Sequence, residues 1–265
     1  MKTKRPTVAD IRAMKGKRQL TMLRVVTLEE AAAAEQAGID LVSVPPELLG
    51  LEFREAAPTV FAISGLDYGV YVTEEDNLRG AFKILRSGGD AVYCVAGIST
   101  IRRMCEEDIP VCGHVGLIPS KATWTGGFRA VGKTAESALE IWRRVKALDE
   151  VGAFAAEIEV VPGEVAAAIS AKTSLVMLSM GAGTGCDAQY LFADDVLGQN
   201  RGHVPRHSKV YRNFAAEFDR LQQERVSAFQ EYAADVRSGA YPAEKHTLGI
   251  EAEQLDAFLK TLNGQ

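Results

Sequence analysis

The chain has 265 residues, of which 47% are hydrophobic and 25% charged, and these proportions are typical of a folded protein with a full hydrophobic core. Its 30 Lys and Arg against 35 Asp and Glu give a net charge of −5, which argues against the basic surface of a nucleic-acid-binding protein. No apolar run approaches the roughly 18 residues of a membrane span, and the basic N-terminus lacks the apolar segment of a secretory signal. We therefore expect a cytoplasmic protein that binds neither nucleic acid nor membrane.

Short apolar runs, most of them rich in β-branched residues, alternate with amphipathic segments along the chain. The runs, which predict strands, lie at residues 19–26, 39–45, 58–64, 90–96, 109–117, 154–161, 174–183 and 188–193. Eight strands with intervening helices in roughly 250 residues favour a (β/α)8 TIM barrel. A doubly wound open α/β sheet is the competing fold, because periodicity alone does not distinguish the two.

Capping signals place several of the helices between these strands. Thr27 and Glu30 form a capping-box pattern before an alanine-rich segment, and Gly38 ends the helix that follows. Further helices are predicted at residues 73–89, 133–152 and 165–172.

Two connections differ from this regular alternation. Residues 46–57 follow Pro45, begin with a second proline, Pro46, and show no convincing helical pattern, so one crossover helix of the barrel is predicted to be short or missing. Residues 208–239 follow the eighth strand and read as helical. We expect residues 1–265 to form a single barrel domain, with 208–239 as a C-terminal helical extension that packs on the barrel or on a neighbouring subunit.

The functional residues of such a barrel stand at the carboxyl ends of its strands. Glu159 ends an apolar run, and burial there raises a carboxyl pKa towards values suited to proton transfer. Glu157 lies two residues earlier and so on the same face of the strand, although both glutamates also fit a structural ion-pair role. His114, flanked by glycines, is placed to donate to a developing oxyanion or to serve as a structural residue.

A series of motifs carries a resemblance to a known family. The stretch IPVCGHVGLIPSKATWTGGFRAVGK at 109–133 is followed by IEVVPGEVAAAIS at 158–170 and GAGTGCDAQYLFADDVLG at 181–198, and then by GHVPRHSKVY. In order and spacing this series resembles the ketopantoate hydroxymethyltransferase family, also called 3-methyl-2-oxobutanoate hydroxymethyltransferase. The resemblance is collinear from about Asp90 to Thr247 and weaker towards the N-terminus.

The resemblance implies a (β/α)8 barrel of the phosphoenolpyruvate mutase and isocitrate lyase type, assembled as a homo-oligomeric decamer. It implies transfer of a hydroxymethyl group from methylenetetrahydrofolate to the keto acid α-ketoisovalerate, which gives ketopantoate for pantothenate synthesis. In the family, Mg2+ chelates the keto acid and a glutamate removes the C3 proton. Glu159 matches that glutamate, and His114 matches the family's histidine near the substrate.

The chain departs from the family at the metal site. Pro46, Gly65 and Val95 stand where the family's pattern has two aspartates and a glutamate that hold the metal. These three residues supply no side-chain oxygen for Mg2+, which takes oxygen ligands in octahedral geometry. We therefore expect no metal site, unless Glu47 and Asp67, one and two residues away, rebuild one.

Other replacements suggest how the substrate is held. Glu47 replaces a serine that contacts the substrate in the family, and Tyr93 replaces a lysine, so both are candidate substrate-binding residues together with Arg24. We expect Arg24 either to reach into the upper barrel and pair with Glu157 or Glu159, or to point outward between helices.

Three functions are compatible with this sequence, and whether the chain is an enzyme stays open between them. The first is the family's hydroxymethyl transfer. The second is metal-independent enolate, aldol-type or lyase chemistry on another keto acid by a divergent paralogue. The third is a non-catalytic barrel with a binding or assembly role.

Overall fold

Eight parallel strands close into a barrel in the order of the sequence in the computed structural model, which describes residues 4–264. The strands are β1 (Leu20–Arg24), β2 (Leu41–Val44), β3 (Phe61–Gly65), β4 (Ala91–Tyr93), β5 (Val111–Gly116), β6 (Ala155–Glu159), β7 (Val176–Met180) and β8 (Ala188–Phe192). Seven of them lie within the predicted apolar runs, and β3 extends one residue beyond the run at 58–64. The pairing of β1 with both β2 and β8 closes the ring, so the barrel is confirmed over the open sheet.

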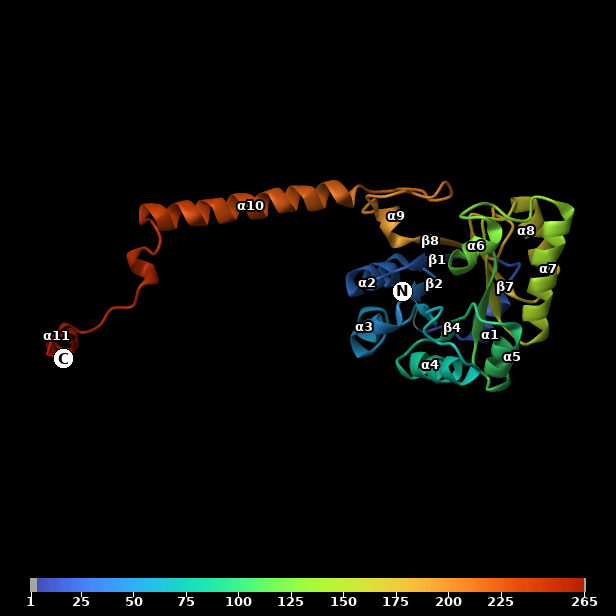
Figure 1. Cartoon of the computed structure of the whole chain (residues 1–265), viewed down its shortest axis with the longest axis horizontal. Helices are drawn as coiled ribbons and strands as arrows, with labels where there is room; N and C mark the ends of the chain where they lie inside the picture. The colour runs from blue at the N-terminus through green and yellow to red at the C-terminus, as the bar shows by residue number, and fades with distance from the viewer. Residues whose placement is uncertain (1–3, 265) are drawn as a thin grey trace. The chain divides into compact units, whose positions relative to one another are not determined.

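Helices surround the barrel (Figure 1). They are α1 (Val8–Met14), α2 (Leu28–Ala37), α3 (Leu51–Ala56), α4 (Glu74–Arg86), α5 (Ile98–Glu106), α6 (Ala122–Thr125), α7 (Ala135–Glu150), α8 (Gly163–Ser170) and α9 (Ala193–Leu197). Those from α2 to α8 connect consecutive strands from β1 to β7, whereas β7 leads to β8 through residues 181–187 without a helix, α1 precedes β1 and α9 follows β8. Short 3-10 turns lie at Pro46–Leu48 and Pro119–Lys121. The helices predicted at 73–89, 133–152 and 165–172 are thus confirmed as α4, α7 and α8.

At the N-terminus of α2, one of the two hydrogen bonds of the predicted capping box is present. The Thr27 hydroxyl accepts from the Glu30 backbone N–H at 3.1 Å, as the pattern predicts. The Glu30 carboxylate, however, accepts from the N–H of Val26 at 2.8 Å rather than from that of Thr27. Gly38 ends the helix in the left-handed region with φ of +75°, where glycine carries no steric penalty.

The connection at 46–57 holds α3, a helix of six residues, so the crossover helix predicted to be short or missing is present and short. Phe53 is fully buried in this segment. The Arg54 guanidinium donates to the carbonyl of Val60 at 2.9 Å and to the carboxylate of Asp90 at 2.7 Å. Contacts with distant residues therefore stabilise α3, because a helix of six residues is not stable by its local preferences alone.

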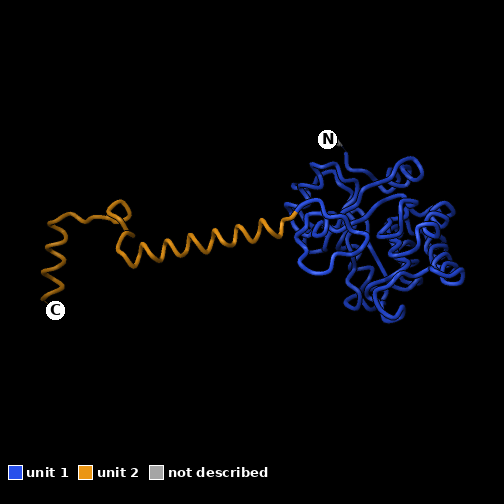
Figure 2. Tube along the Cα trace, turned by 90° about the horizontal axis from the view of Figure 1, so that it is seen from above, with its two compact units in different colours: residues 1–212 blue, residues 213–265 orange. Residues whose placement is uncertain are grey.

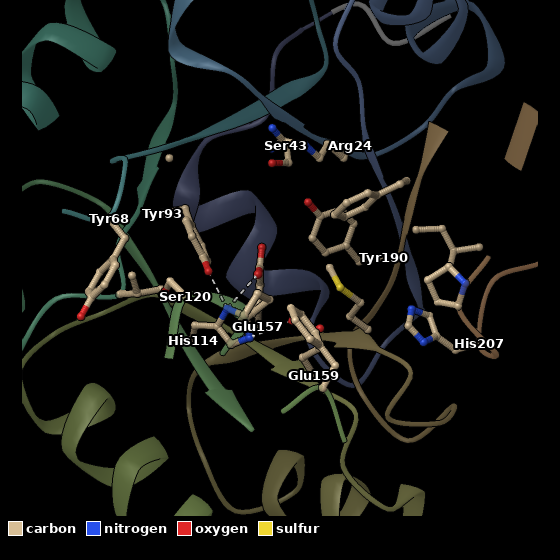
Figure 3. Close-up of a pocket in the computed structure, with 18 of the residues that line it drawn as sticks. Arg24, Ser43, Tyr68, Tyr93, His114, Ser120, Glu157, Glu159, Tyr190 and His207 are labelled. Atoms are coloured by element: carbon tan, nitrogen blue, oxygen red, sulfur yellow. Dashed lines mark hydrogen bonds and ion pairs between the residues drawn. The ribbon is translucent and has the colours of Figure 1, made fainter. Parts of the chain in front are cut away.

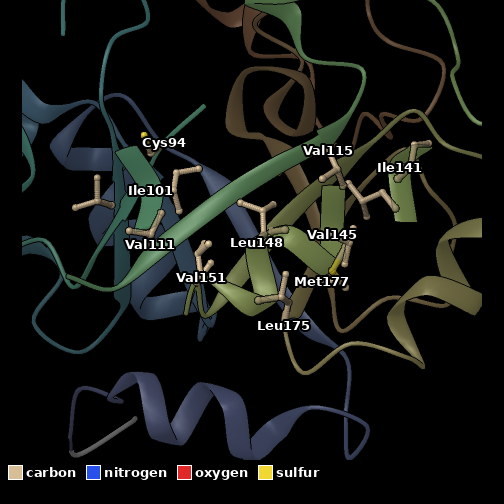
Figure 4. Packing of buried hydrophobic residues seen from close by; sticks show 14 of the residues in the cluster. Cys94, Ile101, Val111, Val115, Ile141, Val145, Leu148, Val151, Leu175 and Met177 are labelled. Atoms are coloured by element: carbon tan, nitrogen blue, oxygen red, sulfur yellow. The ribbon is translucent and has the colours of Figure 1, made fainter. Parts of the chain in front are cut away.

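Outward-facing strand residues form an apolar layer against the helices. Figure 4 shows part of it, where Val111 and Val115 of β5 face Leu148 and Val145 of α7. Inside the barrel, Leu20, Met22 and other apolar side chains fill the lower layers together with Ile11 of α1. The upper interior layer is polar instead, which concentrates the titratable side chains at the carboxyl ends of the strands.

The chain divides into two compact units between Arg212 and Asn213 (Figure 2). The second unit contains α10 (Phe214–Ser238), a 3-10 turn at Glu244–His246 and α11 (Ala252–Leu262). Of the residues 208–239 that read as helical, α10 covers Phe214–Ser238. Within the described part of the chain, no helix combines the length and apolarity needed to cross a membrane.

Candidate functional site

A cavity of about 470 Å³ opens at the carboxyl ends of the strands (Figure 3). Strand side chains that face the barrel axis line it, and loop residues complete its rim. The strand residues in the lining are Arg24, Ser43, Gly65, Tyr93, His114, Glu157, Glu159, Met180, Tyr190, Leu191 and Phe192. This is the end of a TIM barrel at which active sites are built.

His114 lies between two buried carboxylates. Its Nδ1 is 3.4 Å from Glu157 Oε2, and its Nε2 is 3.3 Å from Glu159 Oε2. The Tyr93 hydroxyl lies 2.5 Å from the same Nδ1, and Figure 3 shows the ring between these side chains. The prediction that Glu157 and Glu159 share one face of their strand is confirmed.

The Tyr93 hydroxyl is the hydrogen-bond partner of His114 Nδ1. Burial raises the pKa of the Tyr93 phenol far above its usual value, so the hydroxyl keeps its proton and can donate it to Nδ1. In the tautomer that accepts this proton, the imidazole hydrogen resides on Nε2. Nε2 is buried, lies 3.3 Å from Glu159 Oε2 and makes no hydrogen bond with any residue that the structure describes. In that tautomer, Nε2 has a hydrogen to donate to a ligand in the cavity.

Glu157 is poised for proton exchange near neutral pH. Burial raises the pKa of its carboxyl from 4.5 to about 7. The neighbouring His114 opposes this rise, the Glu159 carboxylate adds to it, and the charge of Arg24 opposes it. Close to pH 7 the Glu157 carboxyl is therefore protonated in a large fraction of molecules.

The backbone at the ends of β5 and β6 holds these groups close together. Gly116 has φ of +85°, and a Cβ at this position would lie 2.3 Å from the Glu159 carbonyl oxygen. Val160 follows Glu159 with φ of +50°, a strained conformation for a β-branched residue. Strain of this kind is concentrated at functional sites.

Arg24 ends β1 and lines the cavity. Its guanidinium therefore reaches into the upper barrel and does not point outward between helices. The expected ion pair with Glu157 or Glu159 is wrong, since no carboxylate of the described residues lies within 4.0 Å of Arg24. The guanidinium carbon instead lies 5.8 Å from the centroid of the Phe192 ring on the adjacent β8. Strands β1 and β6 are not neighbours in the ring, and the cavity separates the charges.

The structure brings four of the five sequence-predicted site residues to this cavity, namely Arg24, Tyr93, His114 and Glu159. Glu47 is not among the lining residues. It is exposed in the 3-10 turn that follows β2, because the turn at Pro46 breaks the strand alternation that would have aimed it inward.

Ser43 and Tyr190 were missed by the sequence analysis although both line the cavity. Each stands two residues beyond an interior apolar residue, Leu41 and Ala188 respectively. Because side chains alternate between the two faces of a strand, the positions of Leu41 and Ala188 could have predicted that Ser43 and Tyr190 face the interior. Their polar groups therefore belong to the same upper layer as His114.

The residues at the family's metal positions do not fit Mg2+. Pro46 lies in a 3-10 turn, Gly65 ends β3 and Val95 is buried with an aliphatic side chain. Asp67 and Glu47 are exposed, and across residues 4–264 no three His, Cys, Asp or Glu side chains are grouped so as to hold a metal ion. The cavity instead contains the guanidinium of Arg24 and the imidazole of His114.

The barrel fold is shared with solved structures. A crystal structure of 2,3-dimethylmalate lyase, a PEP mutase/isocitrate lyase superfamily member, superposes with a TM-score of 0.51 and 16% identity. The match covers 96% of this chain and 99% of that one. The likeness confirms the (β/α)8 barrel fold.

Sequence comparison is more specific. This chain is 31% identical to the 3-methyl-2-oxobutanoate hydroxymethyltransferase of Nitratidesulfovibrio vulgaris, over 97% of its own length and 90% of the relative's. It is 34% identical to the protein of that name from Thermus thermophilus, over 92% and 99% of the two lengths. The model of the family described as ketopantoate hydroxymethyltransferase matches residues 52–244. The chain therefore belongs to the ketopantoate hydroxymethyltransferase family.

Proposed function

We propose that this chain converts 3-methyl-2-oxobutanoate into its enolate and joins C3 to a one-carbon unit, which gives ketopantoate. The observation that carries the proposal is the placement of His114 between two buried glutamates, in a cavity that also exposes Arg24. The cavity of about 470 Å³ lies within the range of small-molecule sites.

Arg24 is the residue proposed to bind the substrate carboxylate. It forms no ion pair with the described residues, and its guanidinium faces the cavity. Two parallel N–H groups of an arginine match the two oxygens of a carboxylate. Binding there orients the keto acid with its carbonyl towards the opposite wall, where the His114 imidazole lies.

Glu159 is proposed to remove the C3 proton. It ends β6, nearer the mouth of the barrel than Glu157 in the interior layer below. As the C3–H bond breaks, its electron pair moves to the carbonyl oxygen, and the Nε2–H of His114 donates to that oxyanion. Tyr93 keeps the imidazole in the tautomer that this step requires.

Methylenetetrahydrofolate, when bound, would supply together with one water the one-carbon unit at the oxidation level of formaldehyde, and tetrahydrofolate would leave as the new C–C bond and hydroxyl are completed. The chain's own residues hold the keto acid and move its proton. Because the donor set does not fit Mg2+, no step is assigned to a metal, and Arg24 and His114 supply the stabilisation of negative charge.

Product formation tests this proposal. The purified protein is incubated with 3-methyl-2-oxobutanoate and methylenetetrahydrofolate, and ketopantoate is measured by mass spectrometry. Glu159→Gln should lower the rate about 100-fold or more. Glu164→Gln is the matched control, because Glu164 is exposed on α8 and lies outside the cavity. A Glu159→Gln variant as active as wild type would contradict the assignment.

The replaced metal positions favour a second candidate, metal-independent aldol-type or lyase chemistry on another keto acid. Pro46, Gly65 and Val95 have removed the oxygen donors that the family's pattern places there. A protein that exchanges the C3 proton of keto acids but forms no ketopantoate with the folate donor would support this second candidate over the first. A non-catalytic barrel would do neither.

A homo-oligomer, with the family's decamer as the expected size, is also proposed. Within the second unit, α10 exposes large apolar side chains at helical spacing, among them Phe218, Leu221, Phe229 and Val236. Exposed apolar surface of this extent marks protein interfaces. Light scattering of the purified protein tests the assembly, and a monomer at micromolar concentration would contradict it.

A further inference from the structure

A second cavity adjoins the first on the far side of His114, which lines both. It has a volume of about 840 Å³ and lies between the loops that follow β4 and β5 and the first turns of α7. Four of its lining residues are cations, namely Lys121, Arg129, Lys133 and Arg144. Glu140 is the single carboxylate among the lining residues, so the cavity is strongly basic in a protein of net negative charge.

Lys121 and Arg144 are half-buried and lack a carboxylate partner. Lys121 Nζ donates to the carbonyl of Val95 at 2.6 Å, and Arg144 Nη2 donates to the carbonyl of Ala96 at 3.0 Å. Throughout the described chain, no Asp or Glu oxygen lies within ion-pair distance of either cation. The adjacent backbone carbonyls of Val95 and Ala96 thus hold the positive charges of Lys121 and Arg144 close together in the cavity wall.

The electrostatics of this pair are unfavourable without a ligand. Desolvation lowers the pKa of Lys121, and the nearby charge of Arg144 lowers it further. Desolvation also lowers the pKa of Arg144. Half-burying two like charges with no counter-ion costs free energy, and a bound anion would offset that cost.

Two further features suit an elongated anion with aromatic rings. Gly97, the N-cap residue of α5, lines the cavity and provides no side-chain cap, so the first N–H groups of that helix are open to an anion. Trp124 stands at the rim with 90% of its surface exposed and presents an indole face for stacking.

We propose that this second cavity binds the one-carbon donor, with the donor's carboxylates on Lys121 and Arg144 and its rings against Trp124. The inference rests on the proposed function, which supplies the class of donor, a reduced folate that carries aromatic rings and glutamate carboxylates. His114 belongs to the lining of both cavities, so a ligand seated here would adjoin the keto-acid site.

Equilibrium binding of 5-formyltetrahydrofolate triglutamate, a stable folate probe, tests the inference without turnover. Lys121→Met and Arg144→Met should each raise the dissociation constant about tenfold or more, since each removes a charge-assisted contact. Arg143→Met is the matched control, because Arg143 is the exposed neighbour on the same helix and does not line the cavity. Its affinity should equal that of wild type.

The inference is overturned if wild type does not bind the probe, if Lys121→Met and Arg144→Met bind it as tightly as wild type, or if Arg143→Met weakens binding equally. Inorganic phosphate provides a further arm. If phosphate competes with the triglutamate in wild type but not in Arg144→Met, the result supports the anion site. If wild type binds phosphate but not the triglutamate, the result excludes folate as the ligand of this cavity. Exchange of the C3 proton of the keto acid in the absence of folate tests the proposed function alone. Failure of the folate site is therefore distinguishable from failure of the proposed function.

Discussion

The Glu157 carboxyl makes the free energy of unfolding depend on pH. Replacing it with a neutral side chain should remove this dependence. Its pKa rises from 4.5 to about 7 on folding because the side chain is buried among other side chains of the upper barrel. Below pH 4.5 the carboxyl is protonated in both the folded and the unfolded state and contributes no pH dependence. Between pH 4.5 and 7 the unfolded state releases this proton while the folded state keeps it, so the free energy of unfolding falls as pH rises.

The magnitude follows from the two pKa values. The change from 4.5 to about 7 corresponds to a loss of about 3 kcal/mol, which is complete above pH 7. Glu157→Gln removes the titrating group and keeps the size of the side chain. Relative to wild type, the variant should gain about 3 kcal/mol in its free energy of unfolding between pH 4.5 and 8.

Urea denaturation of both proteins at several values between pH 4.5 and 8 measures this difference. Glu55→Gln on the exposed face of α3 controls for the loss of one negative charge. A difference between Glu157→Gln and wild type that stays constant with pH would refute the reasoning, because it would mean that folding does not perturb this carboxyl.

Three further predictions concern the cavity and its frame. Arg24→Met should raise the dissociation constant of 3-methyl-2-oxobutanoate about tenfold or more, measured by calorimetry, with partial recovery in Arg24→Lys; unchanged affinity would exclude Arg24 as the carboxylate ligand. Gly116→Ala should lower the free energy of unfolding by more than about 1 kcal/mol, because the new Cβ meets the Glu159 carbonyl at 2.3 Å; wild-type stability would contradict this close approach. Titration with Mg2+ and the keto acid should show no stoichiometric metal site, and a site that Glu47 and Asp67 form would revive metal-dependent chemistry.

Most of the barrel could be predicted from the sequence because its signals are local. Every strand coincides with an apolar run to within one residue, and Gly38 ends α2 as expected. The bounds of the short helix α3 could not be predicted, because its stability comes from Phe53 in the core and from Arg54, whose partners Val60 and Asp90 lie outside the helix. Contacts between residues that are distant in the chain produce no hydrophobic periodicity from which the helix could be predicted.

The candidate site was predictable where strand geometry determines it. Glu157 and Glu159 share a face because side chains alternate along a strand, and His114 is beside them because β5 pairs with β6. The contact between Tyr93 and His114 depends on rotamers that the sequence does not specify. The ion pair expected for Arg24 failed because a contact across the barrel depends on the width of the interior, which no sequence pattern encodes.

Exchange of the C3 proton of 3-methyl-2-oxobutanoate for deuterium, followed by NMR in D2O, tests the central claim that these side chains form an enolate without a metal. Wild type should exchange the proton at the same rate with EDTA as with added Mg2+, and Glu159→Gln should be slower by about 100-fold or more. Exchange that requires added Mg2+, or a Glu159→Gln variant that exchanges at the wild-type rate, would contradict the account.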